Sequence, residues 1–211
     1  MKNNYYKYKS YTALCLGCVL LALLLGQGQC RENAEALAGR ISPSILRFHV
    51  LANSDKDADQ AVKLEVRSLI LDYMQEALKG AQTKAATVQY LKEHREQVEQ
   101  NADLFLASRG FDYQAQLTVT REYFPTRIYD RLVIPCGYYD AARIILGRGQ
   151  GHNWWCVLYP RLCFVDAACT EIPKESQTLL ENELNQGDYL ALQDKRPELK
   201  IRFALFPSWK P

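Results

Sequence analysis

The sequence has little net charge and no low-complexity stretch, and each shortage excludes a class of protein. The chain of 211 residues carries 26 lysines and arginines against 24 aspartates and glutamates. Residues 1–30 hold three lysines and no acid, so the rest of the chain has 23 basic and 24 acidic side chains. A strongly basic face that neutralises many phosphates is therefore not expected, and we predict no nucleic-acid partner.

No glycine- or serine-rich linker and no internal repeat divides the chain after residue 30. Domains typically contain about 100 to 200 residues. The composition, with 48% hydrophobic residues, is that of a globular protein. We therefore expect a linker at residues 31–44 and a single domain over residues 45–211.

The first thirty residues differ from the rest. Lys2, Lys7 and Lys9 precede an uncharged run of sixteen residues, YTALCLGCVLLALLLG, at positions 11–26. A positive flank before an apolar run is typical of a secretory signal. A membrane-spanning helix needs about 20 apolar residues, so residues 1–30 are expected to be either a signal peptide or a marginal anchor formed by residues 11–26.

Hydrophobic periodicity predicts the fold class. Alternation of apolar and polar residues indicates a strand at 45–52, and helical spacing then indicates two long helices and, later, a shorter one. Period-two alternation returns in several segments, ending with a strand at 199–205, while residues 154–159 are apolar on both faces and predict a central strand. This order favours an α+β protein: a single layered domain with a mostly antiparallel sheet and two to three helices. The helices are expected at about 54–80, 88–110 and 173–184, and Gly110 stands where a left-handed C-terminal cap of the second helix belongs.

The histidines have different expected roles. His94 falls on the apolar stripe of its helix and is interpreted as a partly buried structural residue. His49 lies on the polar face of the first strand, beside Arg47 and just before Asn53. This cluster at a strand end is either a contact site or a solvated strand face.

The segment 147–166 gathers glycines, two tryptophans and two cysteines, and three interpretations compete for it. Cys156 could be a thiolate nucleophile activated by His152. Alternatively, His152, Cys156, Cys163 and Cys169 could bind a metal, although they lack the close-spaced ligand pairs of zinc sites. The third interpretation, which we favour, is a core strand with Cys156 and Cys163 bridged across neighbouring strands in an oxidising compartment. We accordingly expect no metal and no cofactor.

Three segments resemble a known family. They read ILRFHVLANSDKDADQAVKLEVRSLILDY (45–73), FDYQAQLTVTREYFPTRIYDRLVIPCGYYDAARIILGRGQ (111–150) and GHNWWCVLYPRLCFVD (151–166). In this order they resemble the stage II sporulation protein R family, whose pattern joins RFHVLANSD to a later GHNWWCVLYPxLCFVD.

The resemblance implies signalling and not catalysis. Proteins of this family look like messengers that the forespore secretes across its inner membrane into the space facing the mother cell. There they trigger a membrane-embedded aspartic protease, which matures the precursor of the mother-cell sigma factor E. The resemblance thus implies a non-enzyme that has this protease as its partner and meets the membrane only through its N-terminal segment. The alternative is a secreted thiol-dependent hydrolase that uses Cys156 and His152.

The two motifs that carry the resemblance also supply the expected partner-binding residues. Their polar and aromatic side chains are costly to place without purpose, and such side chains are favoured at interface centres. We expect the motifs to adjoin in space and to form the surface that contacts the receptor. The residues are Arg47, His49, Asn53, Asp55, His152, Asn153, Trp154 and Trp155.

Overall fold

A computed structural model of the protein describes residues 2–77, 83–163, 172 and 174–193. The helices are α1 (Lys2–Ile41), the short 3-10 helix η1 (Ser42–Ser44), α2 (Asp57–Ala77), α3 (Lys84–Glu93), α4 (Arg95–Ser108), α5 (Lys174–Glu183) and α6 (Gln186–Leu192). The strands are β1 (Leu46–Leu51), β2 (Ala115–Phe124), β3 (Arg127–Tyr129), β4 (Leu132–Ile134), β5 (Gly137–Leu146) and β6 (Asn153–Tyr159). The mixed content confirms the predicted α+β class, and the strand expected at 199–205 lies outside the described residues.

The main sheet has the strand order β2-β5-β1-β6. Strand β1 pairs in parallel with β5, whereas β1 with β6 and β2 with β5 are antiparallel. The expectation of a mostly antiparallel sheet is thus confirmed. The expectation that residues 154–159 form a central strand is wrong, because within the described sheet β6 lies at an edge. Its apolar character comes from cover on both faces of the sheet and not from a neighbouring strand on each side.

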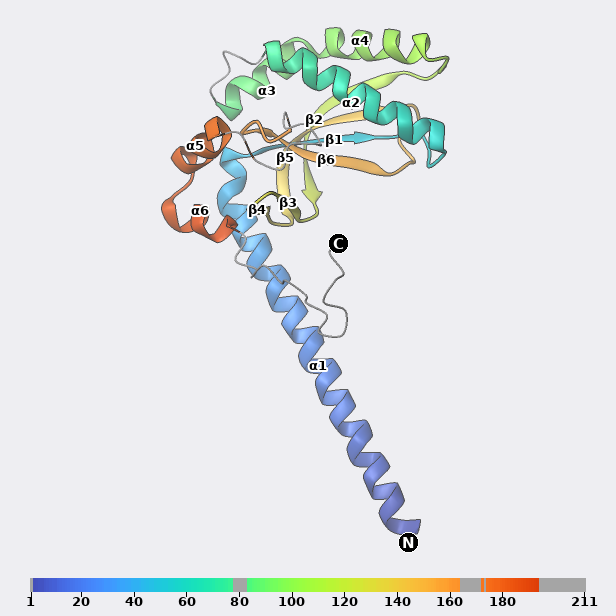
Figure 1. Ribbon diagram of the computed structural model, residues 1–211, viewed down its shortest axis with the longest axis vertical. Helices are drawn as coiled ribbons and strands as arrows, with labels where there is room; N and C mark the ends of the chain where they lie inside the picture. Colours follow the sequence, from blue (N-terminus) through green and yellow to red (C-terminus); the bar gives the residue numbers. More distant parts are fainter. Residues whose placement is uncertain (1, 78–82, 164–171, 173, 194–211) are drawn as a thin grey trace, which may run out of the picture.

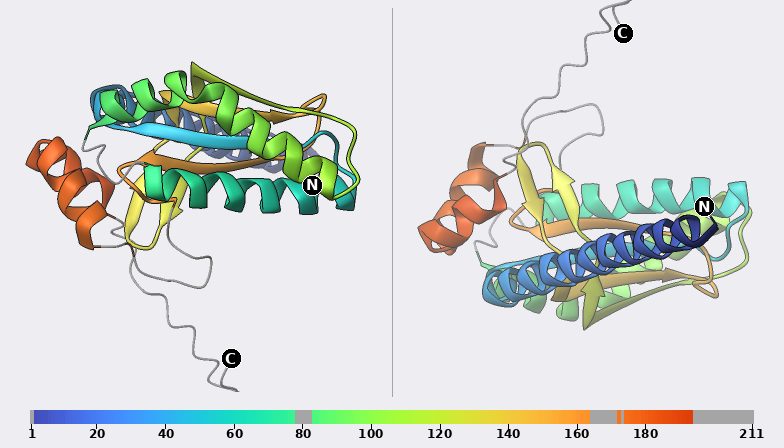
Figure 2. Two further views of the ribbon diagram at one scale, coloured as in Figure 1. Left: turned by 90° about the horizontal axis from the view of Figure 1, so that it is seen from above. Right: turned by 90° about the horizontal axis from the view of Figure 1, so that it is seen from below.

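One face of the sheet lies under a layer of helices. Figures 1 and 2 show α2 and α4 running over this face. Helical spacing along α2 and α4 presents an apolar stripe to the sheet. The side chains that fill this first core include Phe48, Val50, Val66, Met74, Val98, Leu106, Leu117 and Ile144.

The opposite face is covered over part of its area by different elements. Figure 1 shows the end of α1, the β3–β4 hairpin and the pair α5–α6 on this side. The hairpin was not predicted, since its strands are three residues each. The side chains of this second core include Ala38, Ile41, Phe124, Ile134, Tyr139, Val157, Leu180 and Leu192.

Helix α1 joins the apolar N-terminal run directly to the domain (Figure 1). Its stretch from Leu14 onward is long and apolar enough to cross a membrane, and the side chains of the apolar window are not buried. The segment fits the expected signal or anchor. Residues 31–44, expected as a linker, form the end of α1 and the helix η1. Ala38 and Ile41 are fully buried, and the Tyr123 hydroxyl donates to Glu35 over 2.8 Å. The last turns of α1 therefore belong to the fold of the domain.

The helix expected at 88–110 is two helices. α3 ends at Glu93 and α4 begins at Arg95, and half-buried His94 lies between them. The His94 ring stacks on Tyr90 with 4.0 Å between centroids, and its Nδ1 lies 3.0 Å from the Tyr90 carbonyl oxygen. The prediction of a partly buried structural histidine is confirmed. So is the cap at Gly110, whose φ of +82° is in the left-handed region.

Candidate functional site

The loop after β1 is held by one buried carboxylate. Asp59, in the first turn of α2, is 5% exposed and accepts hydrogen bonds from Asn53 Nδ2 at 3.0 Å, Ser54 Oγ at 2.5 Å and the Tyr113 hydroxyl at 2.7 Å. Burial raises the pKa of Asp59, but the three hydrogen bonds favour the charged form and leave its pKa below the ordinary value. Because the carboxylate links β1, α2 and the segment before β2, it fixes the course of the Asn53–Asp55 loop.

The glycine turn before β6 closes over the same loop. The N–H groups of Arg148 and Gln150 donate to the side-chain and main-chain oxygens of Asn53 at 3.0 and 3.2 Å. Gly147 and Gly149 have φ values of +55° and +61°, which favour glycine. A Cβ at Gly147 would lie 2.5 Å from Asn53 Oδ1. The structure thus brings the two sequence motifs side by side, and the glycines form a tight connection between strands.

We call the contact between the Asn53–Asp55 loop and the turn before β6 the junction. Its most exposed part is the pair Asp55 and His152. The His152 N–H donates to Asp55 Oδ1 at 2.7 Å, and the ring Nδ1 contacts the same oxygen. Their side chains are 55% and 80% exposed. The hydrogen bonds from His152 lower the pKa of Asp55. Lys63 Nζ donates to the His152 carbonyl oxygen at 3.0 Å, so the exposed pair is fixed to α2.

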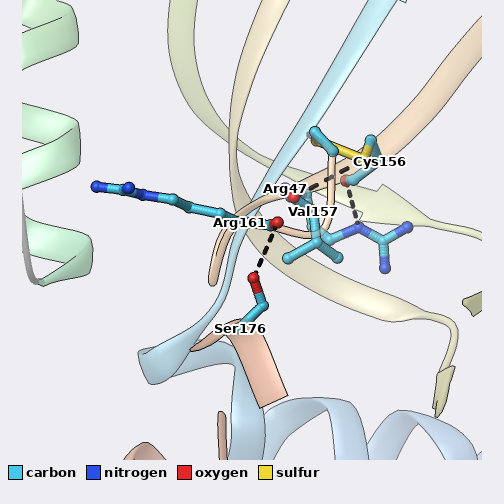
Figure 3. The surroundings of a disulfide bond; sticks show 6 residues. Arg47, Cys156, Val157, Arg161 and Ser176 are labelled. Atoms are coloured by element: carbon cyan, nitrogen blue, oxygen red, sulfur yellow. Dashed lines mark hydrogen bonds between the residues drawn. A yellow bond between two sulfur atoms is a disulfide. The ribbon is translucent and has the colours of Figure 1, made fainter. Parts of the chain in front are cut away.

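Arg47 lies beneath the surface. It is fully buried, and its Nε donates to the Cys156 carbonyl oxygen at 3.1 Å (Figure 3). The guanidinium lies over the rings of Phe124 and Tyr139, at 4.6 and 5.3 Å from their centroids. Within the described part of the chain its two terminal nitrogens have no hydrogen-bond partner. Burial lowers the pKa of Arg47.

His49 is buried beside Arg47. Its ring stacks on Trp155 with 4.8 Å between centroids and an interplanar angle of 1°. Glu122 Oε2 lies 2.9 Å from His49 Nε2, but this carboxylate is also paired with Arg143 at 2.7 Å. Burial, helped by the nearby charge of Arg143, lowers the pKa of His49 to about 4. The structure therefore corrects the expectation that Arg47 and His49 face solvent.

The two tryptophans divide between the faces of the sheet. Trp154 makes an edge-on contact with Phe48 on the helix-covered face, and the Arg67 guanidinium lies 4.8 Å from its ring centroid. Trp155 lies on the other face, against His49. Both are half-buried, as is Asn153, which pairs with Leu51 where β6 begins. Both tryptophans are therefore partly accessible to solvent.

Cys156 and Cys163 form a disulfide with 5.6 Å between their Cα atoms. Cys163 lies in the turn after β6 and not on a neighbouring strand, and its N–H donates to the Val157 carbonyl oxygen at 3.0 Å. Figure 3 shows this turn next to α5, where Ser176 donates to the Arg161 carbonyl oxygen at 3.1 Å. The disulfide leaves Cys156 without the free thiol that a nucleophile or a metal ligand needs. Cys169 lies outside the described residues.

Sequence reasoning missed Asp59 and Tyr113, two side chains that hold the Asn53–Asp55 loop from outside its motif. Tyr113 belongs to a segment with period-two alternation, a pattern that indicates a strand and not a hydrogen-bond partner. The available signal was the Asp59 position in the first turn of α2, where an acid is favoured at a helix N-terminus.

Comparison with known proteins gives a consistent result. A family profile described as Stage II sporulation protein R matches residues 42–169. Stage II sporulation protein R of Bacillus subtilis (strain 168) is 29% identical over 167 residues, which cover 76% of this chain and 75% of that protein. No solved structure matches.

The protein is thus a small α+β domain that follows an apolar N-terminal helix and in which the two sequence motifs meet at the junction. The chain belongs to the stage II sporulation protein R family. A role in sporulation follows from this membership.

Proposed function

We propose that this protein is a secreted messenger of sporulation. The forespore exports it into the space between the two membranes, where it activates a membrane-embedded aspartic protease. The protease then matures the precursor of the mother-cell sigma factor E. The observation that carries the proposal is the family match over residues 42–169, which includes both motifs of the junction.

Two structural features support action outside the cytoplasm. Helix α1 contains an apolar stretch long enough to cross a membrane. The Cys156–Cys163 disulfide is typical of proteins in oxidising compartments. The forespore origin and the identity of the receptor belong to the proposal and come from the family.

The alternative, a thiol-dependent hydrolase, is not favoured. It needs a free Cys156 thiol, and the sulfur of Cys156 is bonded to Cys163. His152 precedes Cys156 by four positions along an extended segment, which spans about 13 Å at 3.3 Å per residue. Its ring contacts Asp55.

The experiment is reconstitution in a bacterium that does not sporulate. The full chain, the receptor protease and the sigma precursor are expressed together, and precursor cleavage is followed by immunoblot. Cleavage is expected only when all three are present. A folded, exported protein that produces no cleavage would contradict the proposed function.

The matched control removes residues 1–30 and keeps the last turns of α1. Ala38 and Ile41 lie in the second core, so this form is expected to keep the domain fold while staying in the cytoplasm. We expect it to abolish cleavage. Cleavage by the cytoplasmic form at the wild-type level would argue against an extracytoplasmic site of action.

A further inference from the structure

Helix α1 runs without a break from its apolar stretch into the domain (Figure 1). Its last turns pack against the start of β5, where the side chain of Ala38 lies in the place that a Cβ on Gly137 would take. Ile41, the last residue of α1, is fully buried. Because the helix is continuous and its end is part of the core, the orientation of the domain at a membrane is set by α1.

The sequence before the apolar stretch is typical of a membrane–water interface. It contains the three lysines Lys2, Lys7 and Lys9 and the four tyrosines Tyr5, Tyr6, Tyr8 and Tyr11. Lysines are enriched on the cytoplasmic side of a membrane-spanning helix, and tyrosines are enriched at both interfaces. This flank therefore favours a helix that stays in the bilayer, with the domain on the opposite side.

The apolar stretch is short for a bilayer. Its sixteen residues, at positions 11–26, span about 24 Å, whereas the hydrocarbon core is about 30 Å thick. A span that is too short thins the bilayer or draws its flanking residues toward the lipid. Arg31 follows Gly26 by five positions, or about 7.5 Å along the helix. Since the headgroup region adds about 5 to 8 Å on each side of the core, Arg31 lies at the headgroup level.

Two tyrosines of the domain lie beside Arg31, whose guanidinium is 5.5 Å from the ring centroid of Tyr123 near the end of β2. Both side chains are fixed to α1, because the Tyr123 hydroxyl and the Arg31 Nε donate to Glu35 at 2.8 and 2.7 Å. Tyr138 pairs with Tyr123 across β5 and β2, and their rings meet edge-on with 5.3 Å between centroids. Tyr138 is 59% exposed. We call Arg31, Tyr123 and Tyr138 the tyrosine patch.

We propose that the tyrosine patch rests on the outer surface of the membrane that α1 spans, with the ring of Tyr138 among the lipid headgroups. A tyrosine ring suits this layer because its body is apolar and its tip is polar. The lipid surface is the partner because the continuous helix holds the patch next to the bilayer. The inference goes beyond the proposed function, since it requires that α1 stay attached to the exported domain and hold it in one orientation.

The test places a fluorescent probe at one position of the full chain in vesicles of phosphatidylcholine and phosphatidylglycerol. All cysteines except Cys156 and Cys163 are replaced by alanine, and Tyr138→Cys is compared with Leu104→Cys. Leu104 is 72% exposed on α4, which lies on the side of the sheet away from the long free part of α1 (Figure 1). A nitroxide on the lipid headgroup is expected to quench the probe at position 138 and not the probe at position 104. Equal quenching at both positions, or none at either, would overturn the proposal.

Photo-cross-linking of the wild type covers the case in which the labelled variants do not fold. The same vesicles then contain a phosphatidylethanolamine with a photoreactive headgroup, and the cross-linked peptides are identified by mass spectrometry. Cross-links are expected in α1 and in the peptides that contain Tyr123 and Tyr138, and none in α4. Cross-links confined to α1 would show that the domain stands clear of the bilayer and would overturn the proposal.

The attachment of α1 is tested on the exported protein by its intact mass. The mass is expected to include the residues before Arg31. An exported protein that begins at residue 27 or later would overturn the inference. If this shortened protein still triggers cleavage of the sigma precursor, the proposed function stands and only the membrane contact is wrong. An intact, membrane-seated protein that triggers no cleavage would instead contradict the proposed function.

Discussion

The two faces of the main sheet are built from the same strands but bury side chains of different chemical character. On the face under α2 and α4, β1 contributes Phe48 and Val50, which are fully buried among apolar side chains. On the opposite face β1 contributes Arg47 and His49, which are 0% and 1% exposed. Alternation along a strand therefore distinguishes its two faces, but it does not show that the polar face meets water.

The difference predicts unlike responses to substitution. Apolar burial stabilises a fold by about 25 cal/mol per Å². A buried charge costs free energy unless hydrogen bonds compensate it. The buried guanidinium of Arg47 is compensated by one hydrogen bond and two ring contacts. The first face should therefore lose stability when a side chain is truncated, whereas the second should tolerate an apolar replacement.

The largest effect is expected from Phe48→Ala on the helix-covered face. Phe48 is fully buried and contacts Trp154, so truncation leaves a cavity. The free energy of unfolding, measured by urea denaturation, is expected to fall by about 3 to 5 kcal/mol. Leu104→Ala is the control, because Leu104 is 72% exposed and should change stability by less than about 0.5 kcal/mol. Similar values for the two variants would show that this face is not the principal core.

The next effect concerns pH and the second face. The pKa of His49 is lowered from 6.5 to about 4 in the folded protein, so between these values the unfolded chain binds the proton more readily. Stability contributed by neutral His49 is therefore present above pH 6.5 and is lost as the pH falls. At pH 4 the loss is about 3 kcal/mol.

The matched variant is His49→Phe, which keeps an aromatic ring against Trp155 and cannot titrate. Unfolding free energies of wild type and variant are measured from pH 7 to pH 4. The wild type is expected to lose about 3 kcal/mol more than the variant over this range. Parallel curves would mean that His49 titrates near its ordinary pKa in the folded protein.

The smallest effect is expected from Arg47→Met. Replacing a buried, incompletely bonded charge by an apolar side chain of similar length is often neutral or stabilising. We expect a change within about 1 kcal/mol in the free energy of unfolding, in either direction. A loss above about 3 kcal/mol would show that the terminal nitrogens of Arg47 have a strong partner, and the contrast between the faces would disappear.

Local patterns in the sequence predicted the features that depend on local chemistry. Alternation at 45–52 located β1, helical spacing located α2, and Gly110 marked a helix end. The motif residues around Asn53 and His152 were expected to adjoin, and the structure places them in direct contact. These predictions depended on sequence spacing and on turn chemistry.

Other features depend on contacts that no local pattern records. The burial of Arg47 arises because α1, the β3–β4 hairpin and α5–α6 cover the second face of the sheet, and cover on both faces likewise makes the edge strand β6 apolar. The role of Asp59 depends on Tyr113, which is 54 positions away in the sequence. Contacts between residues so far apart in the sequence can be recognised only in the three-dimensional structure.

The central claim is that the protein signals by contact and not by thiol chemistry, and a double substitution tests it most directly. Cys156→Ala with Cys163→Ala removes the thiol that the alternative hydrolase would need. Loss of the disulfide, which spans seven positions, is expected to lower stability by about 2 to 3 kcal/mol. In the reconstituted assay, at a temperature where the variant is folded and exported, precursor cleavage per folded molecule is predicted to equal that of the wild type. Complete loss of cleavage by the folded, exported variant would contradict the account.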